Sequence, residues 1–473
     1  MAKEPTIIRK PSRTITLAPL SKPWRVLLES SPWPKNRGTP ALLLIYGFAG
    51  MIALGTILLV LPIANKAGQL TSFTNALFTA TSAVCVTGLV VVDTADYWSL
   101  FGQIVIFLLI QFGGFGFMTS ATLLLLAFRR RIGLRERLLI GESVGLTRLG
   151  GLVKLIKQMA VFTLAAEVIG AIVFLFRFLP ANPPGIAVWK SLFHSISAFN
   201  NAGFDMLGGF RSLAGFRTDP VVILMTAVLI ILGGISYLVL SDLFTRTPGK
   251  LSLDSKLVLT TTCSLLLLGT GVLLLTDFNN PATFGSLPVF GKLLDAFFIS
   301  VTSRTAGFST VNMGNVATHT LFFIMLLMFV GGASGSTAGG VKVNTFGMLI
   351  ATIWSTLRGK RHAGAFGRQF TQQQINRALT VIMLSIGLIS ITVLLLTFTE
   401  SFRFIDLLFE TFSAFGTVGL STGITPQLSI AGKFIITLTM FAGRLGPLTV
   451  GLALIQSQQP AIYHYPEETI RIG

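Results

Sequence analysis

Long apolar runs separated by short polar segments dominate the pattern of this chain. Five runs carry no charged residue, namely 41–61, 221–240, 257–276, 321–341 and 378–399, and three more lie at 101–127, 158–176 and 431–455. A helix needs about 20 apolar residues to cross roughly 30 Å of hydrocarbon. The pattern therefore predicts eight membrane-spanning helices. A polar, basic segment precedes the first run, which is not typical of a cleavable signal peptide.

The composition supports an all-α integral membrane protein. Charged residues make up only 11% of the chain and the mean hydropathy is +0.76, whereas soluble domains carry about 25% charged residues. The two cysteines, Cys85 and Cys263, both lie in apolar sequence and do not form a disulfide framework. The expected environment is the lipid bilayer of a cell membrane, with a bacterial plasma membrane favoured.

The distribution of charge along the chain predicts its orientation in the membrane. One set of connections, 1–40, 129–157, 244–256 and 358–377, holds 24 Lys/Arg and 5 Asp/Glu, and the alternate set, 62–100, 177–219, 276–320 and 399–433, holds 9 of each. Positive charge is retained on the cytoplasmic side of short loops, so the N-terminus is expected inside. This asymmetry accounts for the net charge of +18 and argues against a nucleic-acid partner, for which the chain has no motif.

A short motif recurs four times with a glycine in register. The copies read LFTATSAVCVTGL (77–89), LFHSISAFNNAGF (192–204), AFFISVTSRTAGF (296–308) and LFETFSAFGTVGL (408–420). Their glycines, Gly88, Gly203, Gly307 and Gly419, are 115, 104 and 112 residues apart. A similar spacing combined with a local match indicates an internal repeat, so these glycines are unlike the scattered small residues that merely let membrane helices pack closely.

Each copy is too short to span and lies between two predicted spans on the external side. Non-helical backbone at membrane depth is tolerated only where protein buries it or water reaches it. The expected fold therefore has four tandem M1–P–M2 repeats, with eight transmembrane helices and four re-entrant pore helices around one pseudo-fourfold pore. The expected boundaries are 1–40 for a cytoplasmic tail, 41–145, 146–250, 251–360 and 361–456 for the repeats, and 457–473 for a C-terminal tail.

The glycine turns suggest chemistry for a dehydrated cation. Glycine readily adopts positive φ and lets a carbonyl turn towards an axis, and rings of carbonyls can replace the water shell of an ion. The short helices would point their negative C-terminal ends at the ion. The candidate filter residues are Val86, Thr87, Gly88, Asn201, Ala202, Gly203, Thr305, Ala306, Gly307, Thr417, Val418 and Gly419.

These four motifs resemble the single-glycine filter loops of the Trk/Ktr/HKT potassium-transport superfamily. The resemblance covers nearly the whole chain and is strongest to the Ktr-type membrane subunits. It implies K⁺ as the transported ion and as the only metal, at the filter carbonyls, with Na⁺ as an activator and no covalently bound cofactor. It also implies a homodimer and a cytosolic nucleotide-binding regulatory subunit (KtrA-like). Glycine at all four positions resembles the potassium-selective members.

The predicted last span of the third repeat is interrupted by small residues. A stretch of ten such residues does not hold a stable helix, because glycine costs about 1 kcal/mol relative to alanine. By resemblance this stretch is an intramembrane gate loop, and a packing kink is the alternative. A nucleotide-binding loop is rejected, because Val341 interrupts the motif and no strand precedes it. The candidate gate residues are Gly331, Gly332, Ala333, Ser334, Gly335, Ser336, Thr337, Ala338, Gly339, Gly340, Lys342 and Arg444.

Several charged residues lie in apolar sequence or close to a filter glycine. Arg444, in the last span, is expected to raise a barrier opposite the gate rather than to snorkel to the interface. Arg304 is expected to point away from the axis and hold its loop. Asp93, Asp96 and Asp205 concentrate cations at the mouth or simply cap helices. Glu167 is a proton or ion relay, or a hydrogen-bond partner of a neighbouring helix.

Two competing functions have specific sequence requirements. A secondary K⁺ symporter coupled to H⁺ or Na⁺ by alternating access favours inverted repeats and broken helices in both halves, whereas here only one inner helix is clearly broken by its sequence. A membrane-embedded enzyme needs clustered acids, histidines or metal ligands, and the chain shows no such motif. The sequence therefore predicts an ion-translocating subunit rather than an enzyme.

Overall fold

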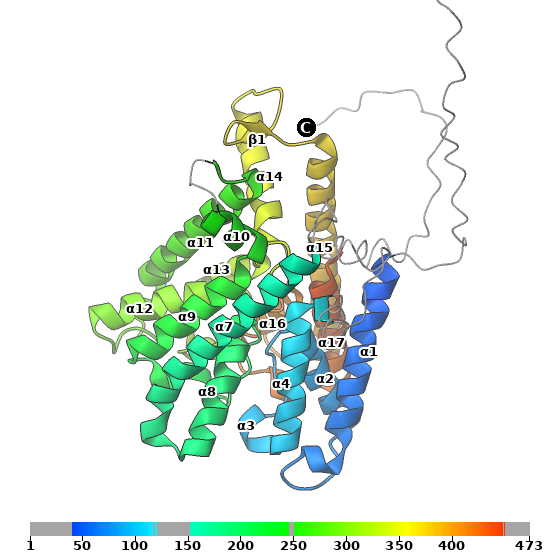
Figure 1. The fold of residues 1–473 in the computed structure, drawn as a ribbon, viewed down its shortest axis with the longest axis vertical. Helices are drawn as coiled ribbons and strands as arrows, with labels where there is room; N and C mark the ends of the chain where they lie inside the picture. The colour runs from blue at the N-terminus through cyan, green and yellow to red at the C-terminus, as the bar shows by residue number, and fades with distance from the viewer. Residues whose placement is uncertain (1–39, 117–118, 121–151, 246–249, 448, 450–473) are drawn as a thin grey trace, which may run out of the picture. The chain divides into compact units, whose positions relative to one another are not determined.

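The described part of the chain is mostly helical in the computed structural model (Figure 1). The structure describes residues 40–116, 119–120, 152–245, 250–447 and 449. Its only sheet within these residues is a hairpin of β1 (Gly364–Ala365) and β2 (Arg368–Gln369), in which Ala365 pairs with Arg368. The tails 1–39 and 450–473 lie outside the described residues, so their predicted locations stay predictions.

Four long helices are each followed by a short helix that ends just before one of the four motif glycines. The long helices are α1 (Pro40–Val60), α7 (Leu152–Phe178), α11 (Leu253–Asp277) and α15 (Gln372–Thr399). The short helices are α2 (Phe73–Val84), α8 (Pro184–Phe199), α12 (Val289–Thr302) and α16 (Phe404–Gly416). Their caps fix these starts: Ser72 caps α2, a proline begins α8, and a capping box begins α15.

A further apolar helix follows each glycine, and two of these helices continue after a break. They are α4 (Leu100–Phe115), α9 (Pro220–Gly234) with α10 (Tyr237–Thr245), α13 (Thr318–Phe329) with α14 (Val343–Leu357), and α17 (Ile430–Leu445). The one-turn helix α3 (Thr94–Tyr97) and the 3₁₀ turns Pro62–Ala64, Leu179–Ala181, Ser212–Phe216, Met313–Asn315 and Thr425–Gln427 complete the elements.

The helices pack in a closed cycle. Each short helix contacts the long helix before it, and also an apolar helix from the preceding glycine segment: α2 packs on α17, α8 on α4, α12 on α9, and α16 on α13. The contact between α17 and α2 joins the last segment to the first, so the cycle closes. Three phenylalanines of the motif, Phe78, Phe193 and Phe409, are fully buried inside it.

The described residues contain fewer full-length spans than the eight that the sequence predicts. Three helices, within 153–181, 253–277 and 372–399, are long and apolar enough to cross a membrane, and α9 with α10 passes only as a pair bent by 95°. Four more apolar helices are 10–17 residues long. Both α4 and α17 end close to residues outside the described part. Eight spans therefore remain a prediction.

The expectation that only one inner helix is clearly broken is wrong. The predicted span 221–240 ends as a helix at Gly234 and resumes at Tyr237 after a 95° bend. The backbone of Gly233 lies directly against the carbonyl of Phe199 at the end of α8, which leaves no space for a side chain. This contact between segments, rather than local composition, marks where α9 ends.

Candidate functional site

The four motif glycines meet in one ring. If a Cβ were added to each glycine, it would lie close to the Cα of the next glycine along the chain, and the last would lie close to the first. The distances are 2.9 Å from Gly88 to Gly203, 3.3 Å from Gly203 to Gly307, 3.0 Å from Gly307 to Gly419, and 3.1 Å from Gly419 to Gly88. Segments separated by more than a hundred residues thus converge without space for side chains. The structure brings together the glycines that the sequence singled out.

The backbone of the four loops shares one unusual conformation. The glycines have φ of 89°, 69°, 79° and 95°, and the residue two positions earlier is also left-handed in each loop: Val86 (55°), Asn201 (56°), Thr305 (75°) and Thr417 (49°). Such angles are rare for non-glycine residues and are a genuine outlier for β-branched ones. Strain that recurs at equivalent positions of four loops points to function, since packing must over-determine it.

The loop amides point back to the short helices. The N–H groups of Thr87, Ala202 and Val418 donate to the carbonyls of Ser82, Ser197 and Ser413, each at 2.8 Å. Gly88 and Gly419 donate to the hydroxyls of Ser82 and Ser413, at 3.1 and 3.0 Å. The carbonyl oxygens of the residues just before the glycines face the glycine of an adjoining loop. The ring is therefore lined by acceptors rather than donors.

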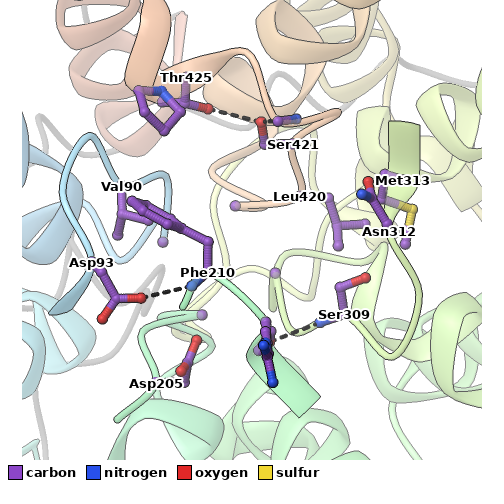
Figure 2. A pocket seen from close by; sticks show the side chains of 18 of the residues that line it. Val90, Asp93, Asp205, Phe210, Ser309, Asn312, Met313, Leu420, Ser421 and Thr425 are labelled. Atoms are coloured by element: carbon purple, nitrogen blue, oxygen red, sulfur yellow. Dashed lines mark hydrogen bonds between the residues drawn. The ribbon is translucent and has the colours of Figure 1, made fainter. Parts of the chain in front are cut away.

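A cavity of about 560 Å³ adjoins the ring, and all four glycines line it (Figure 2). The carboxylates of Asp93 and Asp205 lie in its wall, together with Arg211 and Phe210. Asp93 caps α3, because its Oδ1 accepts hydrogen bonds from the N–H groups of Ala95 and Asp96, each at 2.9 Å. The predicted capping role is thus seen for Asp93, and both Asp93 and Asp205 line the cavity. That these acids concentrate cations there stays a prediction.

The pKa of Asp205 is raised to about 6, and burial of the carboxyl group is the largest cause of this shift. The hydrogen bond from the N–H of Leu207 opposes this shift, whereas the nearby carboxylates of Asp93 and Asp96 add to it. The side chain is charged above this pH and becomes neutral as the external pH falls through about 6. A neutral Asp205 attracts cations less strongly to the cavity.

For the cation transport that the sequence predicts, flux is expected to fall as the external pH drops through about 6. We expect D205N to lower flux at limiting external potassium by roughly two- to five-fold at pH 7 and to flatten this pH dependence. The measurement is uptake against external pH in both proteins.

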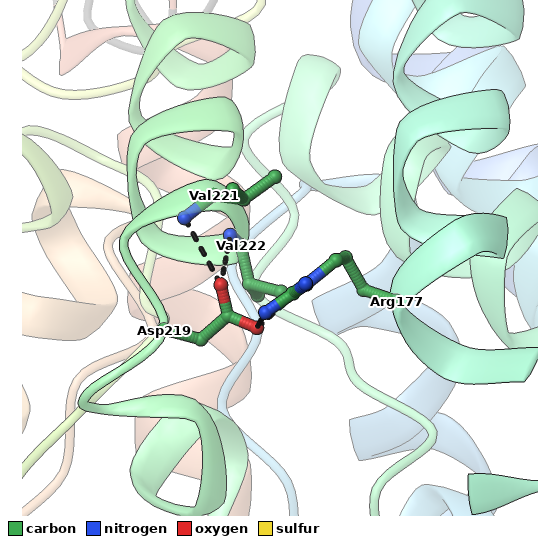
Figure 3. A network of polar contacts seen from close by, with 4 residues as sticks. All are labelled: Arg177, Asp219, Val221 and Val222. Atoms are coloured by element: carbon green, nitrogen blue, oxygen red, sulfur yellow. Dashed lines mark hydrogen bonds and ion pairs between the residues drawn. The ribbon is translucent and has the colours of Figure 1, made fainter. Parts of the chain in front are cut away.

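A matched control is D219N. Asp219 pairs with Arg177 at 2.5 Å and caps α9, outside the cavity lining (Figure 3), and asparagine caps helices as well as aspartate does. An unchanged pH profile in D205N would contradict this role.

The predicted gate loop lies between α13 and α14 and reaches the filter loops. Val330 and Val341 form an isolated parallel bridge, and the Gly331 N–H donates to the Val341 carbonyl at 2.8 Å. A Cβ on Gly339 would meet the side chain of Thr417, and one on Gly331 would lie 3.0 Å from Thr305 Cγ2. The loop thus touches two of the strained filter residues, and glycine is required for this close approach.

Neighbouring helix ends hold the loop from two sides. The Ala333 N–H donates to the Gly234 carbonyl at 2.9 Å, and Thr337 Oγ1 donates to the Gly233 carbonyl at 3.1 Å. Arg444 donates to the carbonyl of Thr337 and, at 2.5 Å, to that of Gly113. Lys342 Nζ donates to the carbonyl of Ala338 within the loop itself. Arg444 therefore ties the loop to α4 and α17, and its guanidinium is engaged by protein backbone.

Arg304 links the third filter loop to the start of the gate loop. Its side chain is buried, and Nη2 donates to the Gly331 carbonyl at 3.3 Å and to Thr262 Oγ1 at 3.5 Å. This arrangement agrees with the predicted role of holding the loop by hydrogen bonds.

Glu167 joins three helices through a closed polar triangle. Its Oε1 accepts from Asn200 Nδ2 at 3.0 Å and its Oε2 accepts from Gln111 Nε2 at 3.2 Å, while Asn200 also donates to Gln111 Oε1 at 3.0 Å. Asn200 is the C-cap residue of α8. Of the two predicted roles, hydrogen bonding to neighbouring helices is the one seen here.

Three glycines at which the inner helices contact the short helices were not among the predicted site residues. Gly113, Gly233 and Gly443 lie against the carbonyls of Val84, Phe199 and Phe415, and none has space for a Cβ. Each of these carbonyls belongs to the fourth residue before a filter glycine. The recurrence of small pairs in QFGGF, ILGGI and FAGRL, 24–30 residues after the filter glycines, is the signal that could have identified them.

The chain is similar in sequence and in fold to known cation transport proteins. A family model described as a cation transport protein (TrkH) matches residues 37–465. The chain is 41% identical to Ktr system potassium uptake protein B of Bacillus subtilis, over 92% of this chain and 97% of that protein. It is 38% identical to Potassium/sodium uptake protein NtpJ of Enterococcus hirae, over 93% and 98%. The crystal structure of the potassium transporter TrkH from Vibrio parahaemolyticus shares the fold, with a TM-score of 0.68 at 18% identity, covering 89% of this chain and 86% of that one.

Proposed function

Because the chain belongs to the TrkH family of cation transport proteins, we propose that it is the potassium-translocating membrane subunit of a Ktr-type uptake system. Family membership agrees with the expectation of a transport protein rather than an enzyme. The relatives at 41% and 38% identity, which the chain matches over nearly their whole length, are named as a potassium uptake protein and a potassium/sodium uptake protein. These names support potassium as the cargo of this chain.

The observation that carries the proposal is the closed ring of four glycines. The amides of Thr87, Gly88, Ala202, Val418 and Gly419 donate to the short helices, so acceptor oxygens remain for a cation that has lost its water. The four short helices end beside the ring, and each C-terminus contributes about half a negative elementary charge. In this proposal four M1–P–M2 repeats surround one pore, and the residues from Val86 to Gly88 and their counterparts in the other loops bind the ion.

The gate is proposed to be the loop 331–340 with Lys342 and Arg444. The loop contacts Thr305 and Thr417 of the filter, and the guanidinium of Arg444 adds a fixed positive charge where the loop is held. A positive charge on a cation path raises the barrier to permeation. Movement of the loop would break the contact between Arg444 and the Thr337 carbonyl and open the path.

Replacing Arg444 with alanine is therefore expected to raise potassium flux. A barrier change of about 1.4 kcal/mol corresponds to a ten-fold change in rate, and we expect an increase of roughly that size. R444K, which keeps the charge but loses the fork that reaches two carbonyls, should give a smaller increase. Flux into proteoliposomes, with folding checked by size-exclusion chromatography, is the measurement. Equal flux in R444A and the parent protein would favour a purely structural role.

Assembly is proposed from the names of the relatives and the charge pattern. The relative from Bacillus subtilis is named as a protein of a Ktr system, which supports a multi-component complex. We propose a homodimer with a cytosolic nucleotide-binding regulatory subunit (KtrA-like), Na⁺ as an activator, and a cytoplasmic N-terminus in a bacterial plasma membrane. The basic connections would face that cytosolic partner.

A symporter remains the second candidate because α9 and α13 are both interrupted. Broken helices at corresponding places are typical of alternating-access transporters, and the sequence alone had indicated only one break. Single-protein conductance far above transporter turnover would argue against this alternative.

The decisive experiment is rescue of a potassium-uptake-deficient bacterium at limiting external potassium. The chain would be expressed with and without a cytosolic regulatory partner. Growth restored by the parent protein, and restored further by the partner, is expected. Failure of a well-expressed, membrane-inserted chain to support any potassium uptake would overturn the proposal.

A further inference from the structure

A short loop over the cavity carries strain comparable to that of the filter. Residues 208–212, here called the strap, include Gly208 (φ 81°), Gly209 (67°), Phe210 (53°) and Ser212 (46°). Of the described non-glycine residues with positive φ, four lie in the filter loops, two lie in the strap and one is Phe366. Such strain persists only where the surroundings over-determine the backbone.

The strap is anchored at both ends to other glycine segments. On one side, the N–H groups of Gly209 and Phe210 donate to Asp96 Oδ2 and Asp93 Oδ2, at 3.0 and 2.7 Å. On the other side, Ser309 donates its N–H to Ser212 Oγ at 3.1 Å, and its carbonyl accepts from the Leu213 N–H at 2.9 Å. The strap therefore crosses the cavity from the segment after Gly88 to the segment after Gly307.

These anchors place an aromatic ring in the entrance. The side chain of Phe210 is 55% exposed and lines the cavity together with the four filter glycines. Figure 2 shows the Phe210 ring projecting into the cavity beside Val90, and the Asp93 carboxylate accepting a hydrogen bond from the Phe210 backbone N–H. An isolated exposed apolar residue is common on a protein surface and needs no explanation. A strained one, fixed by carboxylates from another segment, requires a reason.

We propose that Phe210 is a size-selecting residue that narrows the outer entrance to the filter. The ring leaves room for a small cation to approach the glycines and obstructs bulky ones. Asp93 and Asp96 act as positioning residues, because their carboxylates hold the strap backbone. The selected cargo rests on the proposed function, but the obstruction itself is a property of this entrance.

Access to Val90 tests the proposal without relying on transport. The full-length V90C variant is made with C263A, because Cys263 is exposed whereas Cys85 is buried. The protein in membranes is treated with a bulky neutral reagent, benzyl methanethiosulfonate, and separately with a small neutral one, methyl methanethiosulfonate, so that the two differ in size and not in charge; the adduct is followed by mass spectrometry. With F210A, the bulky reagent should react several-fold faster while the small one changes little. F210W should slow the bulky reagent, and D93N should speed it by releasing the strap.

Matched controls make every outcome informative. F290A removes an exposed phenylalanine of α12 outside the cavity lining and should leave both rates unchanged. If F210A does not fold, F210V and D93N provide the same test. Equal rates for the bulky reagent with and without the Phe210 ring, in folded protein, overturn the proposal. Absence of potassium flux in the parent protein would instead count against the proposed function, and the two failures are therefore distinguishable.

Discussion

Gly203→Ser is expected to lower the selectivity of potassium over sodium by roughly ten-fold, since left-handed backbone costs an L-residue about 1–2 kcal/mol and 1.4 kcal/mol is a factor of ten. Gly203 has φ of 69°, and a Cβ there would lie 2.8 Å from the carbonyl oxygen of Ala306. The loop must shift to admit the side chain, which moves a carbonyl out of the ring. The measurement is the ratio of potassium to sodium flux.

A matched control for this change lies on the helix that precedes the same loop. Gly185, in the first turn of α8, has ordinary φ, and a Cβ added there would meet nothing within 4 Å, so G185S should leave the flux ratio unchanged. An unaltered ratio in G203S, in protein that still carries potassium, would exclude the ring of carbonyls as the basis of selectivity.

Deleting residues 333–339 is expected to raise potassium flux by roughly ten-fold or more, because a barrier of about 1.4 kcal/mol is removed for each factor of ten. The deletion removes the segment that Gly233, Gly234 and Arg444 hold against the filter loops. It spares Val330 and Val341, which pair with each other. Flux into proteoliposomes with and without the regulatory partner is the measurement.

A milder substitution in the same loop should raise potassium flux by a smaller amount. T337V removes the hydroxyl that donates to the Gly233 carbonyl at 3.1 Å but keeps the loop and its main-chain acceptor for Arg444. Its flux should fall between those of the parent and the deletion. A folded deletion variant that carries no potassium would show that the loop builds the path rather than closing it.

The meeting of the four glycine turns could be predicted from the sequence, because its signal is local and repeated. Each copy places its glycine at a fixed distance from an apolar half-helix, and the left-handed turn follows from residue type. The inner helices also carry recurring small pairs, but the carbonyls that these pairs contact could not be predicted in this way. Gly113, Gly233 and Gly443 matter because a carbonyl from a distant helix lies against each of them, and no local pattern specifies that partner.

For the charged residues too, the sequence shows which residues are unusual, whereas the structure shows what they contact. An arginine in an apolar span is recognisable from the sequence, but the carbonyls that Arg444 contacts lie 107 and 331 residues away. The alternatives for Glu167 remained open in the sequence, since its partners Gln111 and Asn200 come from two other helices. Contacts of this kind are decided by packing rather than by spacing.

The sequence by itself determined that this protein is a helical membrane protein with four equivalent glycine turns and a glycine-rich break at 331–340, because hydropathy and backbone freedom are properties of short segments. Only the tertiary structure decided that α17 closes the cycle on α2, that α9 is also broken, and that the strap crosses the cavity. These features depend on which surfaces meet when distant segments exclude water and satisfy their buried backbone groups together.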